Sequence, residues 1–223
     1  MAKTQFAGDK KKGGSLLFEL EQRIVNKYVS RIPKNIETYH LTLLTILWSV
    51  LIIIFSYFAS KNINWLWLVS LMIFFQYITD LFDGAVGRYR NTGLIKWGFY
   101  MDHLLDYLFL FSILIGYSFI LPREFDYILF FILAIFGAVM VNSYLSFAAT
   151  NEFKINYLKI GPTEIRIIFI AVNTLLILFG KTYAAPALPF ILVFSLAGLI
   201  IVVYRTQRYI WKLDMKNKRS MKR

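Results

Sequence analysis

The sequence contains no cysteine and only two histidines among its 223 residues. The lack of cysteine excludes disulfide bonds and thiolate metal sites, and there is no histidine cluster of the kind that binds zinc. Charged residues are also sparse at 17%, whereas 58% of the residues are hydrophobic. Such a composition is too apolar for an ordinary soluble domain. The chain is therefore expected to reside in a membrane.

The apolar residues form six runs separated by short polar stretches, which favours one helical bundle over a soluble domain with a single anchor. The runs cover residues 41–60, 65–79, 99–121, 127–147, 165–179 and 185–204. The second run is short for a helix that crosses a bilayer, so its helix is expected to continue past Asp80 toward Tyr89. The predicted fold class is an all-α membrane protein with six transmembrane helices, no internal repeat and no second domain.

Basic residues are distributed unequally among the segments that connect these runs. Alternate segments hold 22 of the 25 Lys and Arg residues, and the remaining connections hold only Lys61, Arg123 and Lys181. The positive-inside rule then predicts that both termini lie in the cytosol, which requires an even number of spans. This topology and an affinity for anionic membrane lipids explain the net charge of +12. No basic stripe interleaved with aromatic residues indicates a nucleic-acid partner.

The N-terminal segment changes character along its length. Its first part is basic and lacks the apolar core of a cleavable signal, so a disordered tail is expected. After it, Glu19, Arg23 and Asn26 share one helical face and apolar residues share the other, as in an interfacial amphipathic helix. Glu21 breaks this pattern because it lies on the apolar side. The predicted organisation is a disordered basic tail (1–14), an interfacial amphipathic helix (15–34), the six-span domain (35–204) and a basic cytosolic tail (205–223).

Four of the 13 acidic residues gather at or beside the expected cytosolic ends of the second and third runs. They are Asp80, Asp83, Asp102 and Asp106. An uncompensated Asp at mid-bilayer costs about 3 kcal/mol, so four together require a neutralising partner. At about 100° per helical residue, the first pair lies on one arc and the second pair on one stripe. The two helices can therefore present their carboxylates to each other.

Clustered carboxylates are the oxygen-rich ligands that hard divalent cations prefer, so Mg²⁺ or Mn²⁺ is the expected metal. Gly84 and Arg88 share the first arc, and Gly98 lies on the second stripe. Glycine lets a ligand approach the backbone, and the planar Arg fork suits phosphate oxygens. The set predicts a diphosphate site. The alternative is that the acids are solvated loop residues that pair with Arg88, Arg90 and Lys96.

The segment DLFDGAVGR at residues 80–88, followed by GFYMDHLLD at 98–106, resembles the signature of the CDP-alcohol phosphotransferase family, DxxDGxxAR then GxxxDxxxD. Two positions differ from the usual pattern. Gly87 stands where Ala is usual, and nine residues separate Arg88 from Gly98 where eight are common. The turn chemistry of residues 91–93 can absorb the additional residue.

This resemblance implies an integral membrane enzyme of phospholipid synthesis that transfers a substituted phosphate from a CDP-linked alcohol to an acceptor hydroxyl and releases CMP. It implies that the four Asp residues hold two Mg²⁺ or Mn²⁺ ions, and that Gly84, Arg88 and Gly98 bind the CDP donor. It also implies a homodimer and a lipid or small-alcohol acceptor. The active site is expected on the cytosolic side.

The reaction also needs a proton acceptor for the attacking hydroxyl. In many family members this role is assigned to the last Asp of the motif, which is Asp106 here. A carboxylate bound to cations is, however, a weak base. His103 points about 100° away from the metal stripe, and a neutral imidazole is available near physiological pH. The Asp102–His103 pair resembles the choline and ethanolamine phosphotransferase branch, where this His is regarded as the base. A structural hydrogen-bonding role is the alternative.

Glu164 belongs to the sequence GPTE at residues 161–164, which also resembles that branch. One interpretation is a helix start, with Gly at the cap, Pro at the first position and Glu at the third. The other is that Glu164 is a catalytic residue that orients His103, with Arg166 serving a lipid or donor phosphate. Residues 33–42 are only loosely similar to the family's Pro-Asn-x-Leu-Thr sequence, and no role is assigned there.

Other functions stay open beside the expected transfer from CDP-choline or CDP-ethanolamine to diacylglycerol. Transfer from CDP-diacylglycerol to inositol, serine or glycerol phosphate would use the same kind of site. An intramembrane prenyltransferase also holds a diphosphate with Asp and Mg²⁺, but generally needs a larger bundle and two separated acidic motifs. A cation-coupled transporter would have its acidic residues at the membrane midplane rather than at one face.

Overall fold

The computed structural model describes residues 17–92, 94–151 and 161–220. Within them it contains helices and no strand, and six helices are long and apolar enough to cross a membrane. These six are α2 (Thr38–Ala59), α3 (Leu66–Arg90), α4 (Ile95–Ile120), α5 (Asp126–Thr150), α6 (Pro162–Phe179) and α8 (Leu188–Ser220). Helix α1 (Phe18–Tyr28) precedes them, and the short α7 (Lys181–Ala184) joins α6 to α8. The predicted all-α membrane fold is confirmed.

In the part of the chain that the structure describes, four 3-10 turns extend or connect these helices: η1 (Val29–Arg31), η2 (Ile63–Trp65), η3 (Arg123–Phe125) and η4 (Ala185–Ala187). The predicted disordered tail of residues 1–14 lies outside the described residues, as do the last three residues of the C-terminal tail. The remainder of that C-terminal tail continues α8 to Ser220. Residues 205–220 contain neither Gly nor Pro, so nothing in their sequence ends the helix.

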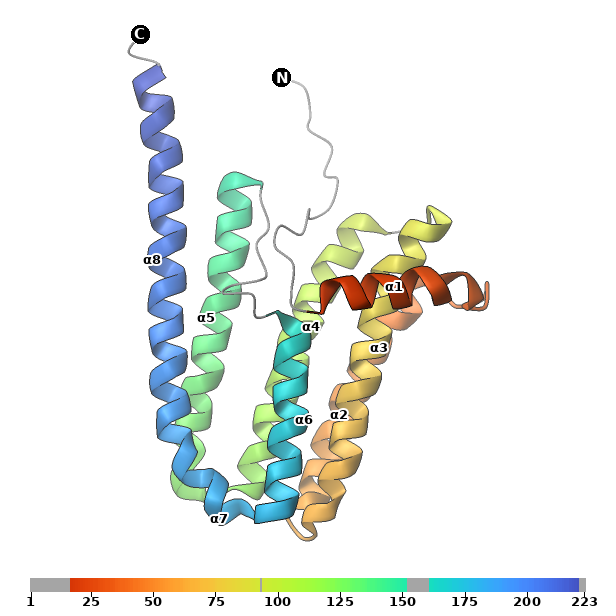
Figure 1. Cartoon of the computed structure of the whole chain (residues 1–223), viewed down its shortest axis with the longest axis vertical. Coiled ribbons are helices and arrows are strands. Elements are labelled where there is room, and N and C mark those ends of the chain that lie inside the picture. The colour runs from red at the N-terminus through yellow and green to blue at the C-terminus, as the bar shows by residue number, and fades with distance from the viewer. Residues whose placement is uncertain (1–16, 93, 152–160, 221–223) are drawn as a thin grey trace.

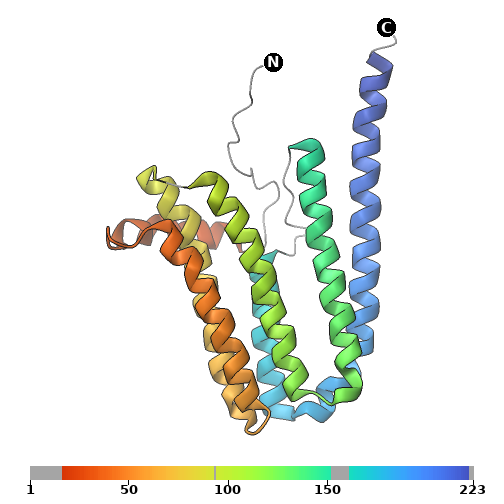
Figure 2. The ribbon, with the colours of Figure 1, turned by 180° about the vertical axis from the view of Figure 1, so that it is seen from behind.

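The long helices run up and down through the bundle (Figures 1 and 2). The connections that follow α2, α4 and α6 lie together at one end, and the turn between α3 and α4 lies at the other (Figure 2). Helix α1 lies across the bundle near the α3–α4 end (Figure 1). The three connections that hold a single basic residue each therefore share one end of the molecule.

Helix α3 continues past the acidic residues, as its short apolar run predicted, and ends at Arg90. Asn91 caps it in the left-handed conformation, with a φ of 54°. Asn tolerates this conformation better than other non-glycine residues because its short amide side chain can hydrogen-bond locally. The chain then reverses into α4 at Ile95, so a turn lies inside the Arg88–Gly98 segment that is one residue longer than in the usual motif.

Helices α2, α3, α4 and α6 enclose the main apolar core. Its side chains that are 2% exposed or less are Ile52, Ala59, Leu66, Val69, Ile73, Ile113, Leu176 and, from the start of α5, Ile128. A Cβ atom at Gly116 of α4 would overlap the side chain of Ser56 on α2. Small residues at such a crossing let helix backbones approach closely within a membrane. The core thus fixes α2 and α4 close together, with α3 beside them.

A polar contact inside this core attaches α6 to both α3 and α4. Asn173 of α6 is fully buried, and its side-chain amide donates to Ser70 Oγ at 3.0 Å. Its Oδ1 accepts from the Tyr117 hydroxyl at 3.0 Å. Hydrogen bonds between helices in an apolar surrounding satisfy groups that no water can reach. These two hydrogen bonds hold α6 in the rotation that directs Asn173 toward α3 and α4.

The segment between α1 and α2 is held against the end of α3. The Arg90 guanidinium donates to the carbonyls of Ile36 at 2.6 Å, Ile32 at 2.9 Å and Pro33 at 3.0 Å. Val25 and Val29 are buried in a small apolar cluster with Ala85 and Val86 of α3. A helix thus forms where the amphipathic pattern predicted it, and it packs on the part of α3 that carries the acidic motif.

Candidate functional site

The four aspartates predicted to bind metal line one pocket. Its lining residues are Thr42 and Thr45 from α2, Asp80 and Asp83 from α3, and Asp102, Leu105 and Asp106 from α4. The periodicity of the two acidic pairs predicted that the helices can face each other, and the structure brings them together. Helix α2 adds hydroxyl groups on another side of the pocket.

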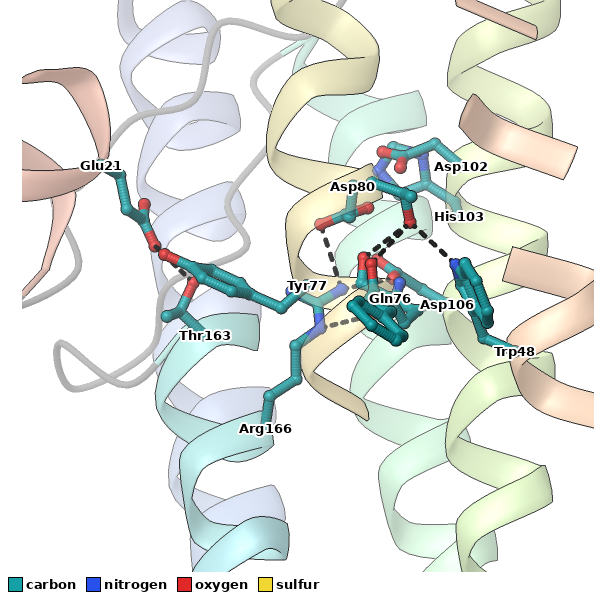
Figure 3. A network of polar contacts seen from close by, with 12 residues as sticks. Glu21, Trp48, Gln76, Tyr77, Asp80, Asp102, His103, Asp106, Thr163 and Arg166 are labelled. Atoms are coloured by element: carbon teal, nitrogen blue, oxygen red, sulfur yellow. Dashed lines mark hydrogen bonds and ion pairs between the residues drawn. The ribbon is translucent and has the colours of Figure 1, made fainter. Parts of the chain in front are cut away.

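Arg166 of α6 reaches the same carboxylates (Figure 3). Only 4% of this residue is exposed. Its Nη2 lies 3.0 Å from Asp80 Oδ2 and 3.3 Å from Asp106 Oδ1, and its Nε donates to Gln76 Oε1 at 2.6 Å. A buried guanidinium needs such partners, and in return it neutralises part of the acidic cluster. The sequence suggested a phosphate partner for Arg166, whereas these contacts are with carboxylates and an amide.

Asp83 is held by a residue to which the sequence assigned no role. It is 6% exposed, and its Oδ2 accepts a hydrogen bond from Thr42 Oγ1 at 2.7 Å. Thr42 is itself buried, and its single hydroxyl proton is shared between Asp83 and the more distant Thr38 carbonyl at 3.1 Å. The available signal was the loose similarity of residues 33–42 to the family's Pro-Asn-x-Leu-Thr sequence, because Leu41–Thr42 ends that segment.

Gly84 and Arg88 lie one helical turn apart on an exposed face near the end of α3. A Cβ atom at Gly84 would lie 2.9 Å from Arg88 Nη1, so the glycine lets the guanidinium fold along the helix. A Cβ atom at Gly98 would meet no heavy atom within 4 Å, which leaves open space beside the start of α4. None of these three residues lines the acidic pocket itself. Their predicted contact with CDP stays a prediction.

His103 lies on α4 beside the pocket, with 12% of its side chain exposed. Its Nδ1 contacts the Phe99 carbonyl and lies 3.9 Å from Asp102 Oδ2. Its ring packs on Phe99 and meets the Tyr144 ring edge-on, with centroids 4.4 and 5.5 Å away. Because a carbonyl can only accept, its contact with a neutral imidazole assigns the proton to Nδ1 and the basic lone pair to Nε2.

Glu164 caps the start of α6. Its Oε2 accepts from the Gly161 backbone N–H at 2.8 Å, and Pro162 occupies the first helical position. The helix-start interpretation of the GPTE sequence is therefore seen in the structure. The pairing of Glu164 with His103 stays a prediction.

The acidic side chains do not form a closed metal site as they stand. Within residues 17–92, 94–151 and 161–220, no group of three or more His, Asp or Glu side chains has the arrangement needed to hold a metal ion. Two of the four aspartates instead share Arg166, and Asp83 bonds to Thr42. The donor set around the pocket nevertheless consists of hard carboxylate oxygens, which suits Mg²⁺ or Mn²⁺.

Residues 38–204 match the family model described as CDP-alcohol phosphatidyltransferase. The chain belongs to this family. No curated protein matches the sequence. Membership in the CDP-alcohol phosphatidyltransferase family assigns phosphotransfer from a CDP-linked alcohol to an alcohol acceptor in phospholipid synthesis. The family predicted from the acidic motif is confirmed, and its placement in the choline and ethanolamine branch stays a prediction.

In this CDP-alcohol phosphatidyltransferase, four helices build the pocket and its immediate surroundings. Helices α3 and α4 carry the acidic signature on either side of a short turn, α2 carries Thr42, and α6 carries Arg166. The family match begins at the first residue of α2 and ends within α8. Helix α1 lies before the matched region, although it packs on the signature helix α3.

Proposed function

We propose that the protein transfers phosphocholine or phosphoethanolamine from its CDP derivative to the hydroxyl of diacylglycerol, with release of CMP. Family membership supports the reaction class. The choice of donor and acceptor rests on the Asp102–His103 pair, which resembles the choline and ethanolamine phosphotransferase branch and which the structure places beside the acidic pocket. The imidazole can accept a proton that the metal-binding carboxylates are poorly suited to take.

The carboxylates of Asp80, Asp83, Asp102 and Asp106 would hold two Mg²⁺ or Mn²⁺ ions. Such ions, when bound, neutralise the charge of the donor diphosphate and of the CMP leaving group. Thr42 fixes one oxygen of Asp83 and so limits how that carboxylate can turn. Arg166 contacts both Asp80 and Asp106. Each of these carboxylates would therefore have to bind the guanidinium with one oxygen and a metal ion with the other, or release the guanidinium when a metal ion binds.

In the proposed reaction, the acceptor oxygen forms a bond to the phosphorus of the donor's phospho-alcohol group. The bond from that phosphorus to the bridging oxygen of CMP breaks, and the hydroxyl proton passes to His103 Nε2. The Phe99 carbonyl and the Tyr144 ring hold the imidazole in one orientation. Glu164 would orient His103 further, and its cap bond is compatible with this role because a carboxylate can accept at both oxygens.

We further propose that the active site and both termini lie on the cytosolic side and that the enzyme is a homodimer. The unequal division of basic residues supports the orientation, since the connections with one basic residue each lie together at the end of the bundle away from the α3–α4 turn. The homodimer rests on family resemblance. Membrane lipids would surround the exposed apolar faces of the long helices.

The purified protein should be tested with a panel of CDP-linked donors against lipid and soluble acceptors, scored by product mass and CMP release. The expected product is phosphatidylcholine or phosphatidylethanolamine, formed from diacylglycerol. Product formed only from CDP-diacylglycerol with inositol, serine or glycerol phosphate would refute the donor assignment and move the protein to another branch. If none of the CDP-linked donors yields CMP, the proposed reaction is refuted.

A further inference from the structure

Glu21 is a carboxylate on the side of α1 where the amphipathic pattern predicts apolar residues. The phosphotransfer site does not include it. The structure shows it half-buried, with Oε1 accepting from Thr163 Oγ1 at 2.7 Å and from the Tyr77 hydroxyl at 3.3 Å (Figure 3). One carboxylate oxygen on α1 therefore joins α3 to α6.

The two donors lie on opposite sides of the Asp80–Arg166 ion pair along the bundle, because α3 and α6 run in opposite directions (Figure 1). Tyr77 stands three residues before Asp80 on α3, and Thr163 stands three residues before Arg166 on α6. Residues three apart share a helix face and lie about 4.5 Å apart along the axis. The Glu21 bridge thus joins the same two helices as the Asp80–Arg166 ion pair, and each of its two donors lies about one turn from one residue of that pair.

Helix α1 is fixed firmly enough to act as a support. Val25 and Val29 are buried against α3, and Arg90 holds the segment that follows η1. Thr163, by contrast, lies in the first turn of α6, where backbone N–H groups lack partners within the helix. A hydrogen bond from this turn to α1 restrains the part of α6 that has the fewest hydrogen bonds within the helix.

We propose that Glu21 is a positioning residue for the phosphotransfer site. By accepting from Tyr77 and Thr163 together, it sets the spacing of α3 and α6 at the level where Arg166 meets Asp80 and Asp106. The proposal rests on the proposed function for its effect on turnover, but its structural part does not. Loss of the bridge lets the start of α6 move away from α3 and loosens the contact of Arg166 with the carboxylates.

The spacing can be measured directly because the protein has no native cysteine. Spin labels at Phe74→Cys on α3 and Ile167→Cys on α6 would occupy exposed positions outside the site, and their dipolar EPR spectrum reports the distance distribution. In this labelled protein, Glu21→Leu should broaden the distribution about twofold, since the start of α6 gains local freedom. Glu21→Gln should restore the original width, because its amide oxygen can accept both hydrogen bonds.

Glu19→Leu is the matched control, since Glu19 is an exposed carboxylate on the same helix, and it should leave the distribution unchanged. Thr163→Val removes one donor at nearly constant size and should broaden the distribution as well. An unchanged width in Glu21→Leu, or a Gln variant as broad as the Leu variant, would overturn the proposal.

Kinetics give the second measurement. Glu21→Leu should lower kcat about tenfold and change the donor KM less than twofold, because the bridge contacts no part of the pocket that would bind the donor directly. Equal kcat in Glu21→Leu and the parent would refute the link to catalysis. If the parent protein transfers nothing from any CDP donor, the proposed function fails, whereas the EPR comparison still decides whether Glu21 positions α6.

Discussion

Arg166 Nη2 lies 3.0 Å from Asp80 Oδ2, and this ion pair connects α6 to the acidic signature on α3. The guanidinium is buried and also contacts Asp106 and Gln76. It is therefore a cation built into the site by the fold. Its presence explains how these acidic residues are accommodated in a mainly apolar bundle before any divalent cation binds.

Replacing this cation should be costly. Arg166→Met removes one partner of a buried pair and should lower the free energy of unfolding by about 3–5 kcal/mol, since two carboxylates lose their compensation. Arg166→Lys keeps the charge but lacks the planar guanidinium, so its stability should lie between that of the Met variant and that of the parent. Thermal unfolding in detergent measures both, with the exposed Arg208→Met as the control. A melting temperature equal to the parent's in Arg166→Met would contradict the compensating role.

The metal hypothesis predicts a sharp loss of turnover from single conservative changes. Asp80→Asn, Asp83→Asn and Asp102→Asn should each nearly abolish transfer while the protein remains folded, because each carboxylate contributes to a shared pair of ions. EDTA should stop turnover, and Mg²⁺ or Mn²⁺ should restore it. Activity above about a tenth of the parent's in any one variant would count heavily against the site.

We expect Thr42 to affect transfer through its hydrogen bond to Asp83. Thr42→Val removes a hydroxyl that donates to a carboxylate, a bond worth about 1.5–3 kcal/mol, so transfer should fall about tenfold or more. Thr42→Ser retains the hydroxyl and should stay close to the parent. Steady-state kinetics with the active CDP donor make the comparison. Equal losses in Val and Ser would show that the methyl group and its packing matter instead of the hydrogen bond to Asp83.

The two proposed roles of Glu164 can be separated. His103→Ala should reduce turnover about 100-fold or more, the usual scale for losing a general base. If Glu164 orients His103, Glu164→Gln should reduce turnover less, and the double variant should be little worse than His103→Ala. If Glu164 only caps α6, the outcome differs. Gln at this position can still accept the hydrogen bond from Gly161, so Glu164→Gln would leave stability unchanged. Glu164→Ala would lower stability by about 1 kcal/mol. Full activity in His103→Ala would return the base role to Asp106.

The orientation predicts which face of the membrane is reached by a water-soluble thiol reagent. Single cysteines at Lys61, Arg123 and Lys181 should be labelled from the non-cytosolic side, because these connections hold one basic residue each. Cysteines at Asn91 and Asn217 should be labelled from the cytosol. Labelling of positions 61 and 91 from the same side would contradict the six-span arrangement.

Much of the fold could be predicted because it depends on local sequence. The length of each apolar run predicted a spanning helix, and the short second run correctly predicted that α3 continues to the acidic motif. Helical periodicity then predicted the convergence of Asp80 and Asp83 with Asp102 and Asp106, because only a short turn separates the two helices.

The contacts that complete the pocket connect residues far apart in the chain. Thr42 and Asp83 are 41 residues apart, Gln76 and Arg166 are 90 apart, and Glu21 and Thr163 are 142 apart. Their pairing is set by how helices pack and rotate against one another, which no local periodicity encodes. Glu21 was visible in the sequence only as an exception to an amphipathic pattern, and its partners required the structure.

The contacts of Arg90 bear on the order in which this protein can assemble during synthesis. The carbonyls that it binds belong to residues 32, 33, 34 and 36, which leave the ribosome more than 50 residues earlier. Helix α1 and the segment after it therefore lack their docking surface until the whole of α3 has been made and inserted. The first of the described helices to be synthesised should therefore dock only after α3, two helices later in the chain, and a chain truncated before residue 90 should leave it undocked.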